Sequence, residues 1–235
     1  CKSSCQWRLK MNLLNALKTI RENANIMSDS DLRKLATEKT TEYSSASYIT
    51  KIRSRSAKFT EVSEDGILSE ELVKIVEMVV DFLKGKELIC VKRTMCANMQ
   101  LNCVSFFTKE YARIGYMWQN SLFDSVSGEV DMQVLQVPEW KERKVIVDAK
   151  NHITFILGSD YFGECKKAFL RMAMHIMKQK GGLGLHAGSK LVKVDGVEKG
   201  VILFGLSGTG KTTLTVHDYG LKSPDGVVVR QDDVI

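Results

Sequence analysis

The chain has 235 residues, of which 44% are hydrophobic and 26% charged, and its net charge is +6. This composition is typical of a globular protein with a sizeable core and excludes a disordered or fibrous chain. The basic residues are spread along the sequence, and no apolar run approaches the ~18 residues of a membrane span. We therefore expect neither a nucleic-acid partner nor a membrane partner. An excess of positive charge also suits an enzyme that binds anionic substrates.

Cysteine usage indicates a reducing compartment. The six cysteines, at positions 1, 5, 90, 96, 103 and 165, show no C-x-x-C spacing. A chain of this size does not need disulfide bonds for stability, and the sequence has no signal-peptide pattern. We predict free thiols and a cytoplasmic location.

Apolar periodicity predicts helices and strands in alternation. We expect helices over residues 7–20, 28–36, 69–83, 108–123 and 163–178. We expect strands over residues 87–90, 102–107, 134–137, 145–148, 152–158, 183–186, 190–194, 201–204 and 227–229, and a loop over 44–60. The strands at 145–148 and 152–158 are expected to form a hairpin-like pair, and residues 195–196 a tight turn. The pattern predicts an α/β fold with two parts: a mixed α+β, substrate-binding domain over 1–180 and the start of a P-loop nucleotide-binding domain over 181–235.

Residues 205–212 read G-L-S-G-T-G-K-T, a complete phosphate-loop motif between a strand-like run and a helix-like run. In this motif, successive backbone N–H groups form an anion-binding concavity, and the helix N-terminus favours negative charge. Lys211 is placed to reach the β- and γ-phosphates, and the Thr212 hydroxyl to hold a divalent metal. The sequence therefore predicts the binding of a nucleoside triphosphate.

Three further elements are expected to converge on this loop. Lys166 and Lys167 open a predicted helix, His186 ends a short apolar run, and Asp232 and Asp233 follow another. A carboxylate after a strand commonly reaches the metal that the phosphates bind. The chain begins without Met and stops soon after the loop, so we expect a fragment of a protein whose nucleotide domain has a further C-terminal portion.

These segments, in their order, resemble the active-site segments of ATP-dependent phosphoenolpyruvate carboxykinases. They read Y-F-G-E-C-K-K at 161–167, G-L-S-G-T-G-K-T-T-L at 205–214 and D-D at 232–233, with His186 between the first two. The family reads approximately Y-x-G-E-M-K-K, M-H-C-S-A-N, G-L-S-G-T-G-K-T-T-L and G-D-D-E-H-G. S-R-S-A-K at 54–58 resembles the family's G-R-S-P-K oxaloacetate-binding loop. The resemblance is strongest from Tyr161 onward.

The resemblance implies a gluconeogenic lyase that decarboxylates oxaloacetate to an enolate and phosphorylates it with the γ-phosphate of ATP. The products would be phosphoenolpyruvate, ADP and CO2. Mn²⁺ and Mg²⁺ would be cofactors. Lys167, His186 and Asp233 would bind Mn²⁺, which requires the Lys167 amine to be neutral. Thr212 and Asp232 would serve the Mg²⁺ of the nucleotide.

The resemblance also assigns substrate-binding roles. Arg55 would bind the substrate carboxylate as a bidentate fork, Tyr161 and Lys167 would line the same pocket, and Lys166 would neutralise charge on the transferring phosphoryl group. Ser207 and Lys211 would take part in phosphoryl transfer. The residues implied to hold ATP are Gly205, Leu206, Ser207, Gly208, Thr209, Gly210, Lys211, Thr212 and Thr213.

The sequence departs from the family pattern in both substrate-side segments. Ala57 stands where the family loop has proline, and Ala187-Gly188-Ser189 replace the residues that follow the family histidine. Two alternatives therefore remain beside the carboxykinase. One is a kinase of the same fold that phosphorylates another acceptor, such as a protein serine. The other is a non-catalytic nucleotide-binding relative.

Overall fold

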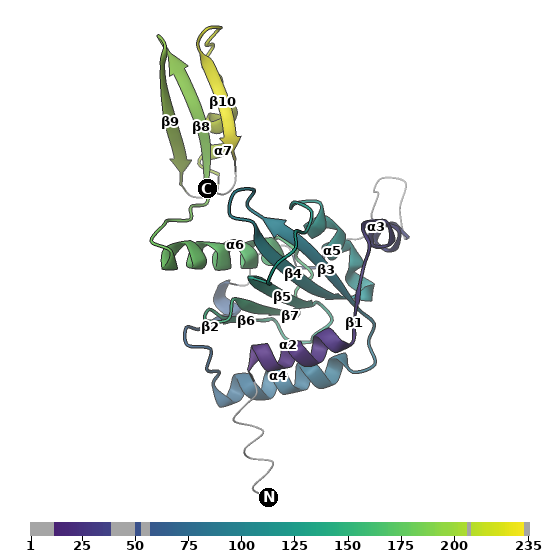
Figure 1. The fold of residues 1–235 in the computed structure, drawn as a ribbon. Helices are drawn as coiled ribbons and strands as arrows, with labels where there is room; N and C mark the ends of the chain where they lie inside the picture. Colours follow the sequence, from purple (N-terminus) through teal and green to yellow (C-terminus); the bar gives the residue numbers. More distant parts are fainter. Residues whose placement is uncertain (1–11, 39–49, 53–56, 206–207, 233–235) are drawn as a thin grey trace, which may run out of the picture. The chain divides into compact units, whose positions relative to one another are not determined.

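The computed structural model describes residues 12–38, 50–52, 57–205 and 208–232. The chain divides into two compact units, Cys1–Met172 and Ala173–Ile235, and the division falls inside helix α6 (Phe162–Gln179). Each unit has its own sheet (Figure 1). The fold is α/β, as the sequence predicts. No helix in the described part of the chain is long and apolar enough to cross a membrane.

The first unit contains a seven-stranded sheet in the order β1-β3-β4-β5-β7-β6-β2. Its strands are β1 (Ala24–Ile26), β2 (Thr60–Ser63), β3 (Leu88–Met95), β4 (Leu101–Thr108), β5 (Met132–Val137), β6 (Lys144–Asp148) and β7 (Ile153–Leu157). Strands β3 and β4 pair antiparallel, as do β6 and β7, and the other neighbours are parallel. The antiparallel β6–β7 pair confirms the predicted hairpin.

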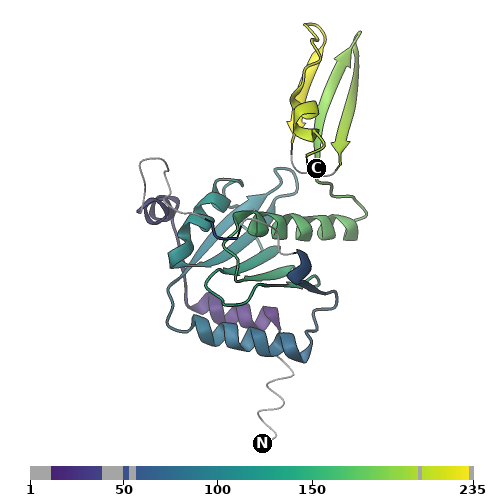
Figure 2. The same cartoon turned by 180° about the vertical axis from the view of Figure 1, so that it is seen from behind.

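Helices cover both faces of this sheet. Helices α2 (Leu13–Glu22) and α4 (Glu70–Leu83) lie on one face, while α5 (Ala112–Gln119) and α6 lie on the other (Figures 1 and 2). The short helix α3 (Asp29–Thr37) packs beside α5. Both α3 and α4 begin after a serine, Ser28 and Ser69, whose hydroxyl accepts a hydrogen bond from a backbone N–H of the first turn.

Strand β4 illustrates why the sheet is buried on both sides. Val104 and Phe106 join the core under α2 and α4. The intervening Ser105 points to the opposite face, where its hydroxyl meets the thiol of Cys165 on α6. On that face Trp118 of α5 and Phe169 of α6 stack at 4.8 Å between ring centroids. Because successive side chains of a strand alternate between faces, a mostly apolar strand such as β4 suits a sheet that is covered by helices on both faces.

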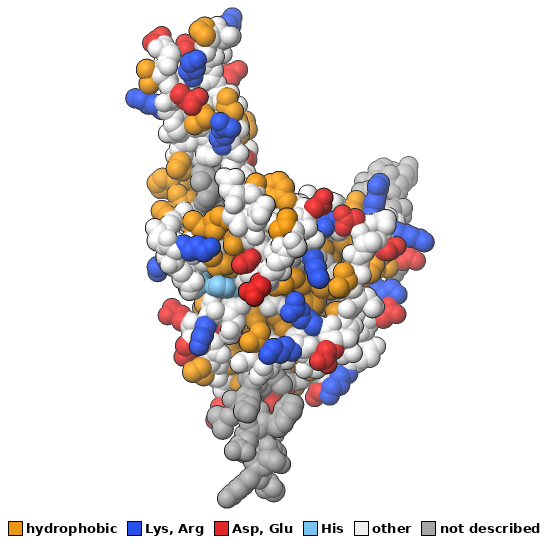
Figure 3. Space-filling view, in the orientation of Figure 1, with side chains coloured by type: hydrophobic (Ala, Val, Ile, Leu, Met, Phe, Trp, Pro, Cys, Tyr) orange, Lys and Arg blue, Asp and Glu red, His pale blue; other side chains and the backbone are white. Residues whose placement is uncertain are grey.

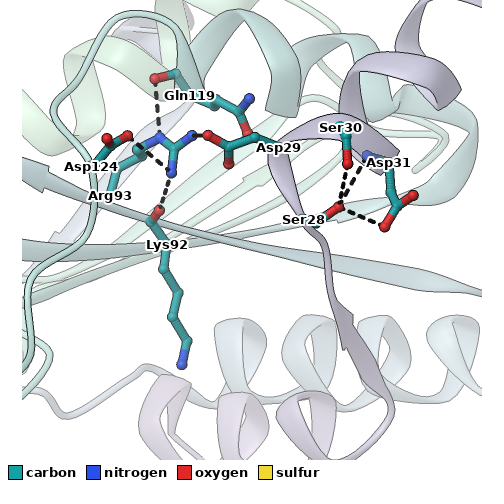
Figure 4. A network of polar contacts seen from close by, with 8 residues as sticks. All are labelled: Ser28, Asp29, Ser30, Asp31, Lys92, Arg93, Gln119 and Asp124. Atoms are coloured by element: carbon teal, nitrogen blue, oxygen red, sulfur yellow. Dashed lines mark hydrogen bonds and ion pairs between the residues drawn. The ribbon is translucent and has the colours of Figure 1, made fainter.

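A buried arginine ties α3 to the sheet (Figure 4). The side chain of Arg93 on β3 is only 8% exposed, and its Nη2 lies 2.7 Å from a carboxylate oxygen of Asp29. Its Nε donates to the backbone carbonyl of Gln119 at 3.2 Å, and its Nη1 to that of Lys92 at 3.2 Å. The guanidinium is therefore paired with a charge and hydrogen-bonded, as a buried charge must be.

In its described residues, the second unit contains the C-terminal part of α6 and a three-stranded antiparallel sheet in the order β10-β8-β9, together with the short helix α7. Its elements are β8 (Ala187–Val194), β9 (Val197–Phe204), α7 (Lys211–Val216) and β10 (Gly226–Gln231). Strands β8 and β9 form a hairpin through the predicted turn at Asp195 and Gly196, both with positive φ. Several apolar side chains are exposed on this unit (Figure 3). Phe204 is one of them and is 73% exposed.

The structure corrects several predicted elements. Residues 183–186 are not a strand: β8 begins at Ala187, directly after His186. The predicted helix over 108–123 is shortened to α5, preceded by a 3-10 turn, Lys109–Tyr111. The predicted loop over 44–60 contains a 3-10 turn, Ala57–Phe59, and leads at Thr60 into strand β2. Residues 7–11 of the first predicted helix lie outside the described residues.

Candidate functional site

Three predicted site segments meet at one edge of the sheet in the second unit. Ala187, the first residue of β8, pairs with Phe204, the last residue of β9, and Ser189 pairs with Gln231, the last residue of β10. His186 therefore immediately precedes the edge, the phosphate loop leaves from it, and Asp232 follows it. This convergence results from antiparallel pairing, which brings the start of the middle strand to the ends of both neighbours.

The phosphate loop curls through left-handed backbone conformations. Gly208 has φ +81° and Gly210 has φ +85°, a region that favours glycine. At Gly205 the absence of a side chain relieves a tight contact, because a Cβ there would lie 3.0 Å from the Thr209 hydroxyl oxygen. The Lys211 ammonium donates to the Gly205 carbonyl at 2.9 Å, which closes the loop on itself. Leu206 and Ser207 lie outside the described residues.

Helix α7, which follows the loop, packs closely on β8. Gly188 provides the space: a Cβ built there would lie 1.9 Å from the Thr215 hydroxyl oxygen. Thr215 is fully buried, and its hydroxyl donates to the Lys211 carbonyl at 2.8 Å. Thr212 and Thr213, on the same helix, are exposed. The helix is thus fixed on one side and presents its first turn to solvent.

A buried lysine fastens the other end of α7. Lys190 on β8 is 1% exposed, and its ammonium donates to the carbonyls of Leu214 and His217 and to the Tyr219 hydroxyl, the last at 2.7 Å. The ammonium also lies 4.1 Å from the centroid of the Tyr219 ring. A cation at a helix C-terminus satisfies carbonyls that have no partner within the helix. This residue was not predicted from the sequence, because the partners of its ammonium lie 24 to 29 residues further along the chain.

Asp232 presents an unused acceptor at the site. Its backbone N–H donates to the Gln231 side-chain oxygen at 2.9 Å. Its Oδ1 is buried and accepts no hydrogen bond from any residue that the structure describes. Buried carboxylate oxygens usually have a partner, so this atom fits a cation ligand. Asp233 lies outside the described residues, and within them no three His, Cys, Asp or Glu side chains gather closely enough to hold a metal.

In the first unit, the predicted residues Tyr161, Lys166 and Lys167 lie at the beginning of α6. The Tyr161 ring folds over Gly163, where a Cβ would lie 2.4 Å from it, so the glycine makes room for the ring. Lys166 and Lys167 are half-buried in the second turn. Cys165, which directly precedes them in the sequence, is fully buried, and burial raises its pKa to about 12. The thiol is therefore neutral near pH 7 and does not act as a nucleophile.

Asp160 is a second residue that the sequence analysis missed. It is 4% exposed, directly precedes Tyr161, and accepts hydrogen bonds from the backbone N–H groups of Lys51 and Ile52. Its position directly before the run Y-F-G-E-C-K-K is the feature of the sequence that could have indicated this residue. Arg55, the predicted carboxylate ligand, lies outside the described residues.

A glycine loop between a strand and a helix, with a carboxylate at the end of another strand of the same sheet, is typical of P-loop nucleotide-binding proteins. Comparison with known proteins gives the family. A family model described as phosphoenolpyruvate carboxykinase matches residues 4–235. The chain belongs to the phosphoenolpyruvate carboxykinase family.

Relatives named phosphoenolpyruvate carboxykinase (ATP) include proteins from an archaeon, a bacterium and a plant. The protein of Aeropyrum pernix is 40% identical over 162 residues, which cover 66% of this chain and 33% of that protein. The protein of Lysinibacillus sphaericus is 28% identical over 188 residues, covering 71% of this chain and 33% of that protein. A Zea mays protein of the same name is 42% identical over 66 residues, 28% of this chain and 10% of its own length. The chain spans about one third of the length of the first two relatives.

Proposed function

We propose that the protein containing this chain converts oxaloacetate and ATP into phosphoenolpyruvate, ADP and CO2. The observation that carries the proposal is the convergence of His186, the phosphate loop and Asp232 at one sheet edge, in a chain of the carboxykinase family. The names of the Aeropyrum and Lysinibacillus relatives support ATP as the phosphate donor. Free thiols at the four described cysteines suit the cytoplasm as its location.

Residues 205–213 hold the ATP phosphates in this proposal. The positive-φ glycines Gly208 and Gly210 turn backbone N–H groups toward a bound anion, and Lys211 adds a positive charge. The exposed Thr212 hydroxyl and the unpartnered Oδ1 of Asp232 are hard oxygen donors, which Mg²⁺ prefers. The residues present therefore fit a magnesium nucleotide.

The residues proposed for Mn²⁺ are Lys167, His186 and Asp233. Imidazole and carboxylate suit this cation, and His186 is exposed at the sheet edge from which Asp232 and Asp233 continue. Lys167 acts as a ligand only with its amine neutral. When bound, the cation would supply positive charge where the enolate develops negative charge.

The remaining residues bind and orient the substrates. Arg55 holds a carboxylate of oxaloacetate, Tyr161 lines the pocket, and Lys166 and Lys211 offset charge on the transferring phosphoryl group. Ser207 is proposed to bind ATP and to take part in the phosphoryl transfer. Catalysis of this kind depends on positioning and charge, because phosphoryl transfer gives a protein little covalent chemistry to perform.

A coupled assay on the longest natural form of the protein tests this function. It follows phosphoenolpyruvate formation from oxaloacetate and ATP with Mn²⁺ and Mg²⁺, for the wild type and for Lys167→Ala and Arg55→Ala. We expect turnover in the wild type and a loss of roughly 100-fold or more in each variant. ATP affinity should change little in both, which an equilibrium titration with a fluorescent ATP analogue checks. Wild-type protein that binds ATP without oxaloacetate-dependent turnover would contradict the proposal.

A further inference from the structure

Asp160 joins two distant segments of the first unit. Its Oδ2 accepts the Lys51 N–H at 2.8 Å and its Oδ1 accepts the Ile52 N–H at 2.9 Å. The carboxylate is nearly buried, at 4% exposure, and it lies between β7 and α6 in sequence. Each oxygen of one side chain thus holds one of two successive backbone N–H groups from more than 100 residues away.

The backbone on either side of Asp160 is held by the centre of the sheet. Gln136 on β5 is fully buried, and its side-chain amide donates to the Ser159 carbonyl at 2.8 Å and to the Tyr161 carbonyl at 3.4 Å. The Tyr161 carbonyl also accepts the Glu164 N–H in the first turn of α6. The backbone of residues 159–161 is therefore fixed to β5 and α6, and this holds Asp160 in place.

We propose that Asp160 is a positioning residue for oxaloacetate binding, which fixes residues 51–52 to the residue directly before Tyr161. The inference rests on the proposed function, in which Tyr161 lines the substrate pocket. In the sequence, residues 51–52 lead into S-R-S-A-K, the run with Arg55. Loss of the two hydrogen bonds to Asp160 releases residues 51–52 and weakens substrate binding. The phosphate loop of the second unit keeps its own contacts.

The geometry explains why this position needs a carboxylate. Both oxygens face an N–H donor, and a carboxylate is an acceptor at each of its two oxygens. Asn has one acceptor oxygen and one NH2 group, so Asp160→Asn sets an NH2 donor against an N–H donor. One backbone N–H then loses its partner in a partly buried environment, which is costly.

The test compares Asp160→Asn with Asp131→Asn in the longest natural form of the protein. Asp131 is a matched control because its Oδ2 alone accepts a distant backbone N–H, that of Asn102 at 2.7 Å, and Asn can replace it there. Steady-state kinetics give KM for oxaloacetate, KM for ATP and kcat. Hydrogen exchange of the peptide that contains Lys51 and Ile52 gives a readout that does not require activity.

For Asp160→Asn we expect a rise of about tenfold in KM for oxaloacetate, with KM for ATP within about twofold of the wild type. We also expect faster exchange in the peptide with residues 51–52, and neither change in Asp131→Asn. Unchanged exchange, or a KM for oxaloacetate that stays at the wild-type value in folded Asp160→Asn, would overturn the proposal. A parallel rise of both KM values would overturn it as well, because it indicates general destabilisation. Wild-type protein without oxaloacetate turnover would instead contradict the proposed function. Hydrogen exchange would still show whether Asp160 holds residues 51–52.

Discussion

At the scale of single residues, the chain buries polar groups wherever it needs a fixed backbone. Arg93 holds α3 and α5, Lys190 holds the end of α7, and Asp160 holds residues 51–52. The sequence predicts the exposed chemistry of the site from its motifs, but it does not predict these buried residues. Their roles depend on partners tens of residues away, and no local spacing reveals such partners.

Burial of Cys103 predicts a pH dependence of stability. Burial raises the pKa of the Cys103 thiol well above its ordinary value, and the nearby Asp131 carboxylate adds to the effect. The folded state therefore keeps a proton that the unfolded state releases as the pH rises through about 9. Its contribution to stability is complete below that pH and declines above it, by up to about 1.4 kcal/mol per pH unit.

Urea unfolding at pH 8, 9 and 10 measures this decline, with Cys103→Ala as the comparison. The alanine variant should lose the part of the slope that the thiol causes. Iodoacetamide labelling at pH 8, read by mass spectrometry, should modify the half-buried Cys96 faster than Cys103 in the folded protein. Equal labelling of the two thiols, or identical slopes in both proteins, would show that Cys103 is not protected as described.

At the scale of elements, the accuracy of the sequence predictions follows the length of the pattern. Helix α4 was predicted within a residue because it has a serine cap and four turns of apolar periodicity. Strands β1 and β2, with three and four residues, were missed because so short a run carries no periodicity. The strand predicted over 183–186 is wrong, because β8 begins at Ala187, which pairs with Phe204. A run of apolar residues alone does not determine where strand pairing begins.

The close packing of α7 on β8 gives a prediction for Gly188. The added Cβ in Gly188→Ala would lie 1.9 Å from the Thr215 hydroxyl, so α7 must shift. We expect a destabilisation of about 1–3 kcal/mol together with weaker ATP binding, because the same helix ends the phosphate loop. Urea unfolding and titration with a fluorescent ATP analogue measure the two effects.

Gly200→Ala on β9 is the control, since no atom lies within 4 Å of a Cβ built there. Thr215→Ala combined with Gly188→Ala should recover part of the loss by removing the closest atom. If Gly188→Ala behaves like Gly200→Ala in both measurements, the close contact does not determine how α7 is held.

At the scale of the whole molecule, the sequence locates the phosphate-loop segment but not the strand order of the large sheet. The phosphate loop, the following helix and the strand before Asp232 were located from motif and context, and the family was identified from four short segments. The order of the seven-stranded sheet was not predictable, because β2 pairs with β6 and β1 with β3 across long stretches of chain. Such pairings depend on tertiary packing rather than on local pattern.

The central claim is that the γ-phosphate of ATP is transferred to the enolate of oxaloacetate. The most direct measurement incubates the longest natural form of the protein with γ-³²P-labelled ATP, oxaloacetate, Mn²⁺ and Mg²⁺, and determines where the label goes. We predict label in phosphoenolpyruvate, released in equal amount with CO2. Label in a protein side chain with none in phosphoenolpyruvate would contradict the claim and indicate a kinase with another acceptor.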